Sequence, residues 1–180
     1  MPVSQPVPET TPVRPIARLA SELSVTGVGQ FALGFAVLAV ALTSSDIEPA
    51  RAVVPFAVTF VVLSGLSIYQ SRWLKGVDAP PADPRARVEE PSLTTRRSLI
   101  GLIPALIAVA VATLIGPGLG VVLGGVVAGV GVIDLRNRAW VRTREAQLRG
   151  ELYRELGGSP FSSGKRPLYT LPRNESTLAT

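Results

Sequence analysis

The chain has 180 residues, of which 47% are apolar and only 17% are charged, and its formal net charge is +5. An average globular domain carries about 25% charged residues. The sequence contains no cysteine and no histidine, which excludes disulfides, thiolate nucleophiles, imidazole bases and most zinc or haem sites. The composition therefore favours a membrane protein that is not an enzyme, with no cofactor and no metal.

The first 24 residues contain five prolines before Ile16. Such a composition cannot bury enough apolar surface to fold alone. We therefore predict a disordered N-terminal tail over 1–24 with a short amphipathic helix. It is not a secretory signal, because a signal places its basic start directly before its apolar core.

Four apolar stretches follow, at 25–44, 50–69, 98–115 and 118–133. A helix needs about 20 residues to cross the hydrocarbon of a bilayer, with about 17 as the lower limit. The rest of the chain is mostly proline-rich tail and linker, which cannot cover four helices that are apolar on every side. The sequence therefore predicts an all-α integral membrane protein with four transmembrane helices.

The four helices are expected to form two helical hairpins, at 25–73 and 94–135. A cytoplasmic linker over 74–93 joins them and is rich in proline and charge. Gly116-Pro117-Gly118 predicts a tight turn in the second hairpin. Pro104 is expected near the first turn of its helix, where proline is tolerated. If the second pair does not cross fully, it forms a re-entrant hairpin with both ends on the same side.

The basic residues predict the orientation. Of the 18 lysines and arginines, 17 lie in the N-terminal tail, in the connection from Arg72 to Arg97 or after the fourth apolar stretch, and only Arg51 lies in a short connection. Basic flanks stay cytoplasmic, so both termini are expected inside (N-in/C-in). The arginine-rich composition is typical of a GC-rich bacterial genome, which suggests the bacterial plasma (inner) membrane. The aromatic and basic residues at the helix ends are predicted membrane-interface anchors: Tyr69, Arg72, Trp73, Arg96, Arg97, Arg136, Arg138 and Trp140.

Small residues recur at four-residue spacing in the second hairpin, which places them on shared helix faces. Small side chains let helix backbones approach closely in lipid. The face is expected to pack either within this chain or against a second copy or another membrane protein. Its predicted helix-packing residues are Gly116, Gly120, Gly124, Ala128, Gly125, Gly129, Ala108 and Ala112.

Beyond Asp134 the fourth helix is expected to continue as a cytoplasmic amphipathic helix over 136–157. Its leucines at four-residue spacing, Leu148, Leu152 and Leu156, form a candidate partner stripe. Its arginines are expected beside anionic lipid headgroups at the inner face. Residues 158–180, rich in Ser, Thr, Pro and Gly, are predicted to be a disordered tail.

No ionisable residue lies deep within an apolar stretch, which argues against ion-coupled transport. Binding of nucleic acid is not expected, because topology explains the positive charge and no basic-aromatic platform for stacking bases is present. The expected function is a non-enzymatic accessory or scaffold subunit of a bacterial membrane complex. A small oligomeric transporter or channel is the first alternative, and a lipid-binding or membrane-shaping hairpin protein is the second.

Overall fold

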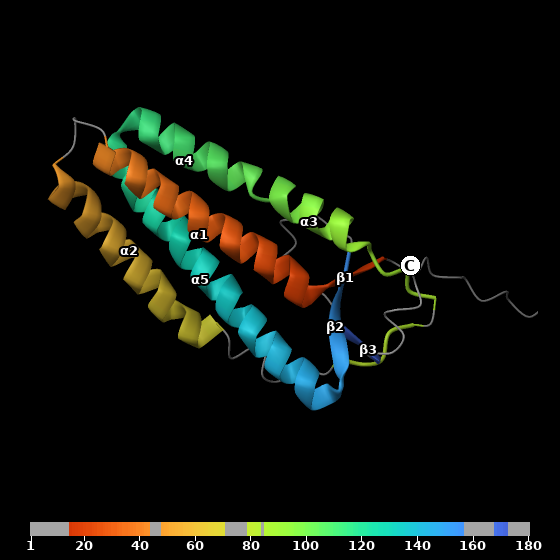
Figure 1. The fold of residues 1–180 in the computed structure, drawn as a ribbon. Coiled ribbons are helices and arrows are strands. Elements are labelled where there is room, and N and C mark those ends of the chain that lie inside the picture. Colours follow the sequence, from red (N-terminus) through yellow and green to blue (C-terminus); the bar gives the residue numbers. More distant parts are fainter. Residues whose placement is uncertain (1–14, 44–47, 71–78, 84, 157–167, 173–180) are drawn as a thin grey trace, which may run out of the picture.

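The computed structural model describes residues 15–43, 48–70, 79–83, 85–156 and 168–172, with the side chains of 67–70 excepted. The helices lie alongside one another and a small sheet lies at one end of them, which we call the sheet end (Figure 1). The elements are β1 (Ile16–Arg18), α1 (Leu19–Thr43), α2 (Pro49–Gln70), α3 (Pro91–Ile100), α4 (Ile103–Ile115), α5 (Pro117–Leu148), β2 (Gly150–Glu155) and β3 (Leu168–Pro172).

Within the described residues, four helical segments are long and apolar enough to cross a membrane: α1, α2, α3 with α4, and α5. Their outward side chains are mostly valine, leucine and isoleucine. These features indicate a multi-pass membrane protein, as the sequence predicts.

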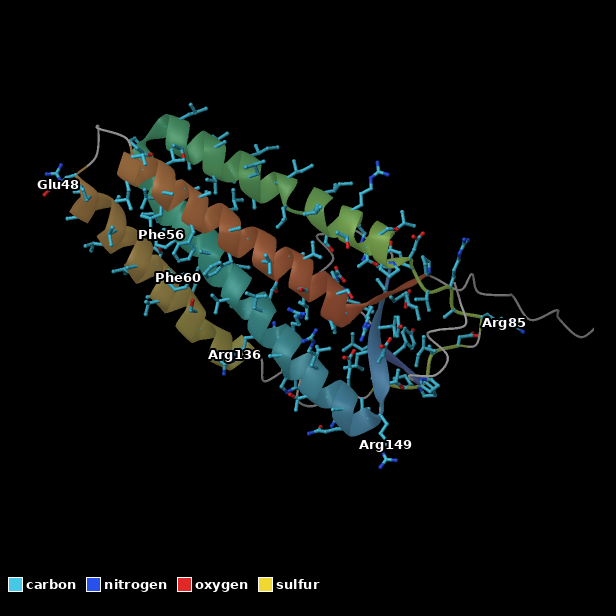
Figure 2. All side chains as sticks on the ribbon, viewed as in Figure 1. Glu48, Phe56, Phe60, Arg85, Arg136 and Arg149 are labelled. Carbon is cyan, nitrogen blue, oxygen red and sulfur yellow. The ribbon has the colours of Figure 1, made fainter. Side chains whose placement is uncertain are left out.

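Helix α5 is the common neighbour in the bundle, because α1, α2 and α4 all pack against it. Four phenylalanines fill the space between α1 and α2. Phe35 of α1 meets Phe56 and Phe60 of α2 edge to face, with ring centroids 5.1 and 5.8 Å apart. Figure 2 labels Phe56 and Phe60 on α2. Phe31 joins them at 4.6 Å from Phe35. Aromatic pairs favour this geometry.

The third membrane segment begins at Pro91, earlier than the apolar stretch suggests, and is broken between α3 and α4 at Gly101 and Leu102. Pro104 explains the break. It has no N–H to donate to the carbonyl of Ile100, and its ring collides with that carbonyl. Pro104 lies in the first turn of α4, as the sequence predicts, but the segment already begins at Pro91, so the proline interrupts it rather than starting it.

The sheet has the order β1-β2-β3 and is antiparallel throughout. Ala17 pairs with Arg154, and Tyr153 pairs with Tyr169. Residues 79–83 lie along the outer edge of β3 and residues 85–90 along the outer edge of β1, which protects edge strands from pairing with other chains. Their backbone bonds join Ile16 to Arg87 and Glu89, and Thr170 to Pro80 and Ala82, at 2.8–3.0 Å.

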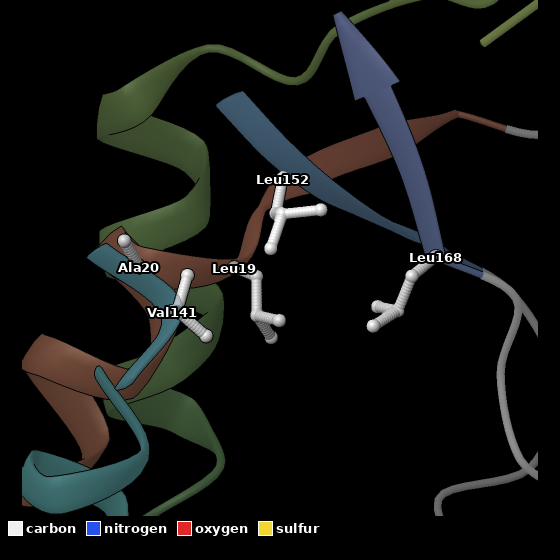
Figure 3. Packing of buried hydrophobic residues seen from close by; sticks show 5 residues of the cluster. All are labelled: Leu19, Ala20, Val141, Leu152 and Leu168. Carbon is white, nitrogen blue, oxygen red and sulfur yellow. The ribbon is translucent and has the colours of Figure 1, made fainter. Parts of the chain in front are cut away.

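Two apolar clusters form the core. One lies between the sheet and the adjoining helices and contains Leu19, Ala20, Val141, Leu152 and Leu168 (Figure 3). The other lies deeper in the bundle and contains Ala41, Ala52, Phe56, Val121 and Ala128. The first cluster attaches the sheet to the helices.

The prediction of an amphipathic helix over 136–157 is wrong beyond Leu148. The helix ends at Arg149, which adopts a left-handed conformation with φ 52°. The chain then enters β2, where Leu152 is only 2% exposed. Burial of Leu152 in the sheet leaves less apolar surface in water than an exposed helical stripe would, so tertiary packing overrides the local spacing.

The predictions of a disordered tail over 1–24 and over 158–180 are wrong for part of each range. Strand β1 and the first turns of α1 lie within 1–24, and β3 lies within 158–180. These segments gain from one another the apolar cover and hydrogen bonds that neither has alone.

Candidate functional site

A layer of charged side chains lies at the sheet end, between the helices and the sheet. Glu22, in the first turn of α1, contacts Arg154 of β2 and lies 3.8 Å from Nη2 of Arg97 on α3. Its side chain is 14% exposed. One carboxylate therefore joins two helices and the sheet.

The same Arg97 also holds the segment that leads into α3. Its Nη1 donates to Oε1 of Glu89 at 3.0 Å, and the hydroxyl of Thr94 donates to Oε2 of Glu89 at 2.7 Å. Thr94 is 1% exposed. Because Glu89 also bonds to Ile16 through its backbone, these contacts fix the segment against β1.

Asp134 of α5 completes this layer. It lies beside the hydroxyl of Thr26, with Glu22 and Arg154 as its charged neighbours. We use the name charged layer for Glu22, Glu89, Thr94, Arg97, Asp134 and Arg154. Charges removed from water need partners, and each of the two arginines here contacts a carboxylate.

A second polar cluster lies on the sheet. Arg18 contacts Glu151 at 2.8 Å, and the hydroxyl of Tyr153 donates to the other oxygen of Glu151 at 2.9 Å. Burial raises the pKa of Tyr153 well above its ordinary value, and the neighbouring Glu151 carboxylate raises it further. This cluster ties β1 to β2 through side chains as well as backbone.

The charged layer connects helices to the sheet through side-chain contacts. Its carboxylates lie beside arginine or hydroxyl groups, although Oε2 of Glu22 and Nη2 of Arg97, 3.8 Å apart, share no hydrogen bond. The hydrogen-bonded pairs fix the orientation of their carboxylates. Among the described residues, no group of three or more His, Cys, Asp or Glu is placed to hold a metal ion. The layer can hold α1, α3, α5 and β2 together.

Some buried polar atoms near this end have no hydrogen-bond partner within the described part of the chain. They include Oε1 of Gln30, Oγ of Ser98, Oδ1 of Asn137 and Nε of Arg138. Asn137 and Ser98 are 9% and 5% exposed. Such groups in a folded protein call for a physical explanation, such as water or a ligand.

The predicted helix-packing residues divide into two sets. The first set contacts three helices of this chain. A Cβ at Gly120 would meet Thr113 of α4, one at Gly125 would meet Thr59 of α2, and one at Gly129 would meet Leu63 of α2. Gly124 and Ala128 face Gly34 of α1, and Ala112 is 6% exposed.

The second set lies outside these contacts. A Cβ built on Gly116 would meet nothing within 4 Å, and Ala108 is exposed. The row of small residues therefore packs against this chain only along part of its length.

The sequence reasoning missed the matching row on α1. Ala20, Gly27, Gly34 and Ala41 recur every seven residues, and all four are buried. A Cβ at Gly27 would lie 3.0 Å from the carbonyl oxygen of Gly131, and one at Gly34 would lie 2.4 Å from that of Gly124. A seven-residue repeat of small residues was the available signal. Glu22, Glu89 and Arg154 were missed because only the fold brings them together.

The predicted membrane anchors have different surroundings. Arg97 belongs to the charged layer, whereas Arg96 and Arg136 are exposed. Trp140 packs against the apolar cluster under the sheet, and Arg138 is partly buried. The side chain of Tyr69 and the whole of Arg72 and Trp73 lie outside the described residues.

The predicted partner stripe is not a continuous helical face. Leu148 ends α5 and is 41% exposed, Leu152 is buried in β2, and Leu156 follows β2. The prediction of a leucine stripe is therefore wrong, because the helix that would align these residues ends before the second of them.

No protein-family model, curated protein or solved structure gives a significant match to this chain.

Proposed function

We propose that the chain is a non-enzymatic multi-pass membrane protein that acts as an accessory or scaffold subunit of a bacterial plasma-membrane complex. One observation carries the proposal: strands from before α1 and after α5 form one sheet at one end of the bundle, and the segment between α2 and α3 is joined to both of its edges by isolated bridges. We call the sheet β1-β2-β3 the platform, and we propose that it lies beside the membrane.

The platform is rigidly joined to the helices. Strand β1 runs into α1 at Leu19 without a connecting residue, and only Arg149 separates α5 from β2. The charged layer adds side-chain contacts across the same junction. Residues 1–14 precede β1 and residues 173–180 follow β3, so the sheet fixes the points from which both polar tails depart. Such fixed departure points suit recruitment of a partner protein.

The sheet end is proposed to face the cytoplasm, because most of the basic residues flank it. The absence of cysteine from the chain permits a direct test with single substitutions. Glu48→Cys lies at the opposite end of the bundle and Ser92→Cys at the sheet end, and both positions are exposed (Figure 2 shows Glu48). A membrane-impermeant maleimide should label intact cells only through Glu48→Cys. Labelling of Ser92→Cys from outside would reverse the orientation.

Transport or channel activity is the alternative function, but the contacts between α1 and α5 do not favour it. These helices touch through Gly27 and Gly131, and again through Gly34 and Gly124. Close backbone contact leaves no room for a solute at that interface. A path would therefore have to run elsewhere, either between other helices or between copies of the chain.

The subunit proposal is tested by purification of the tagged full chain in mild detergent. A stoichiometric partner is expected, and its loss is expected when residues 1–14 and 173–180 are deleted together, a change that leaves every strand in place. A matched thermal unfolding curve shows that the deletion variant is folded. A partner-free oligomer that mediates solute flux in vesicles would replace the proposal with the transport alternative. Vesicle deformation without flux would favour the membrane-shaping alternative.

A further inference from the structure

Arg138 on α5 is partly buried and contacts no carboxylate among the described residues. Its Nε atom is buried and has no hydrogen-bond partner there, as is also true of Nε of Arg18. Three other partly buried arginines each contact a glutamate: Arg18, Arg97 and Arg154. A charge withdrawn from water without a partner is costly. Arg138 lacks the carboxylate contact that these three have, whereas Arg144, which is also partly buried, donates from Nη1 to Oε1 of Gln147 at 3.2 Å.

The acidic residues on the same helix are engaged elsewhere. Asp134, one turn before Arg138, lies beside Thr26 of α1. Glu145, two turns after it, accepts a hydrogen bond from the backbone N–H of Leu152 at 3.0 Å. Neither forms an ion pair with Arg138, although a carboxylate four residues earlier is well placed for one.

A second unpaired arginine lies one turn further along this face. Arg142 is exposed, and it follows Arg138 by four residues, so the two side chains share one side of α5. Like charges at this spacing repel each other. In the described part of the chain, this face carries two positive charges with no ion-paired carboxylate, which is an arrangement that suits a bound anion.

The depth of Arg138 indicates the source of the anion. The apolar stretch of α5 ends at Ile133, and five further residues of helix advance roughly 7 Å. The headgroup region on each side of the hydrocarbon is about 5–8 Å thick. Arg138 therefore lies at the level of lipid phosphates, and the aromatic Trp140 follows two residues later.

We propose that Arg138 and Arg142 bind the phosphate of an anionic phospholipid headgroup. A guanidinium offers two parallel donors that match two phosphate oxygens, and the phosphate supplies the missing negative charge. The inference needs only that α5 crosses the membrane, and it goes beyond the subunit proposal. It specifies a lipid site on one face of α5.

The test uses the purified full chain in nanodiscs of phosphatidylcholine, with and without phosphatidylglycerol. Thermal unfolding is followed through the tryptophan fluorescence of wild type, Arg138→Gln, Arg142→Gln and Arg85→Gln. Arg85 is exposed on the 79–90 segment, so Arg85→Gln makes the same charge change away from the site. Phosphatidylglycerol should raise the Tm of wild type and Arg85→Gln. Arg138→Gln should lose at least half of that rise, and Arg142→Gln a smaller part.

An equal rise in Arg138→Gln and wild type overturns the proposal. So does a full rise with inorganic phosphate added to phosphatidylcholine nanodiscs, because the anion is then not a lipid. Should Arg138→Gln fail to unfold cooperatively, Arg138→Lys decides, since it keeps the charge and loses the paired donors. A reduced rise supports the proposal and an undiminished rise overturns it. No partner protein is present, so failure here leaves the subunit proposal standing.

Discussion

At Gly34 the backbones of α1 and α5 approach so closely that a single added carbon would lie 2.4 Å from a carbonyl oxygen of Gly124. Glycine to alanine inside a helix ordinarily stabilises it by about 1 kcal/mol. Here the added methyl must push two helices apart, and overpacking costs about 1–3 kcal/mol. At this position the glycine-to-alanine change is therefore expected to destabilise the protein instead of stabilising it.

We predict that Gly34→Ala lowers the Tm in detergent and that Gly65→Ala does not. Gly65 lies on α2, and a Cβ there would meet nothing within 4 Å. The two variants differ only in whether the methyl has room. Equal Tm values for Gly34→Ala and wild type would show that α1 and α5 do not touch at this point.

Removal of the Glu22 charge should destabilise the fold far more than removal of an exposed carboxylate. Glu22→Gln removes the negative charge that Arg154 and Arg97 share in the wild type. Loss of one partner of a fully buried pair costs about 3–5 kcal/mol. The arginines here are about one-third exposed, so we expect a loss on the order of 2 kcal/mol.

The matched control is Glu48→Gln, which removes the same charge from the exposed Glu48–Arg51 pair. That change should alter the unfolding free energy by less than about 0.5 kcal/mol. Denaturant unfolding of both variants measures the difference. Equal losses would mean that the charged layer does not clamp the helices to the sheet.

Ionisation of Tyr153 is expected to lower the stability of the sheet at alkaline pH. Its pKa in the folded chain is raised by burial and by Glu151, so the folded state favours the neutral phenol. This contribution is complete below the unfolded pKa of about 10 and is lost as the pH rises beyond it. Tyr153→Phe should therefore lose less stability than wild type between neutral and strongly alkaline pH. The pKa of Tyr169 is also raised, by burial and by the neighbouring Glu155, so Tyr169→Phe should reduce the loss as well, but to a smaller extent because this position is more exposed.

Among the elements, α1 and α5 could be predicted almost completely from the sequence. Their apolar length predicts helices, and small residues at seven-residue spacing on α1 indicate the face that meets α5. Strand β2 could not be predicted in the same way. Its residues follow a helix without any proline, and Leu148, Leu152 and Leu156 keep helical spacing across the boundary. What ends the helix is the burial of Leu152 against β1 and β3, which depends on segments far away in sequence.

The same argument holds for the charged layer. Arg97 was expected to anchor α3 at the membrane interface because it flanks an apolar stretch. Its partners Glu22 and Glu89 come from α1 and from the 79–90 segment, and no spacing rule connects them. Sequence patterns report contacts within an element, whereas this site is made of contacts between elements.

The end of α5 offers a prediction for a single element. Arg149 adopts φ 52°, a conformation that costs a residue with a side chain about 1–2 kcal/mol and costs glycine little. Arg149→Gly should therefore raise the Tm, and Gln147→Gly, within the last helical turn, should lower it. Hydrogen–deuterium exchange at Gly150 and Glu151 provides a second measurement. A lower Tm for Arg149→Gly would mean that the Arg149 side chain contributes more than its backbone costs.

At the scale of the whole molecule, the sheet is expected to be necessary for the stability of the helices. A chain that ends after Arg149 lacks β2 and β3, exposes Ala17 and Val141, and removes Arg154 from Glu22. We predict a clearly lower Tm for this truncation. A chain that ends after Pro172 keeps all three strands and should unfold as wild type does. If both truncations unfold alike, the helices are stable without the sheet.

The meeting of the first and last strands also has a consequence for synthesis of the protein. Glu22 and Arg154 lie 132 residues apart, and a ribosome adds about 5–20 residues per second. On the order of 10 s therefore passes between synthesis of the start of α1 and synthesis of its partner strand β2. During that interval β1 can bond only to the segment before α3, and Glu22 has Arg97 but not Arg154. Closure of the sheet is thus a late event of biogenesis, and a nascent chain that stalls before β2 carries an unfinished edge that quality-control factors could recognise.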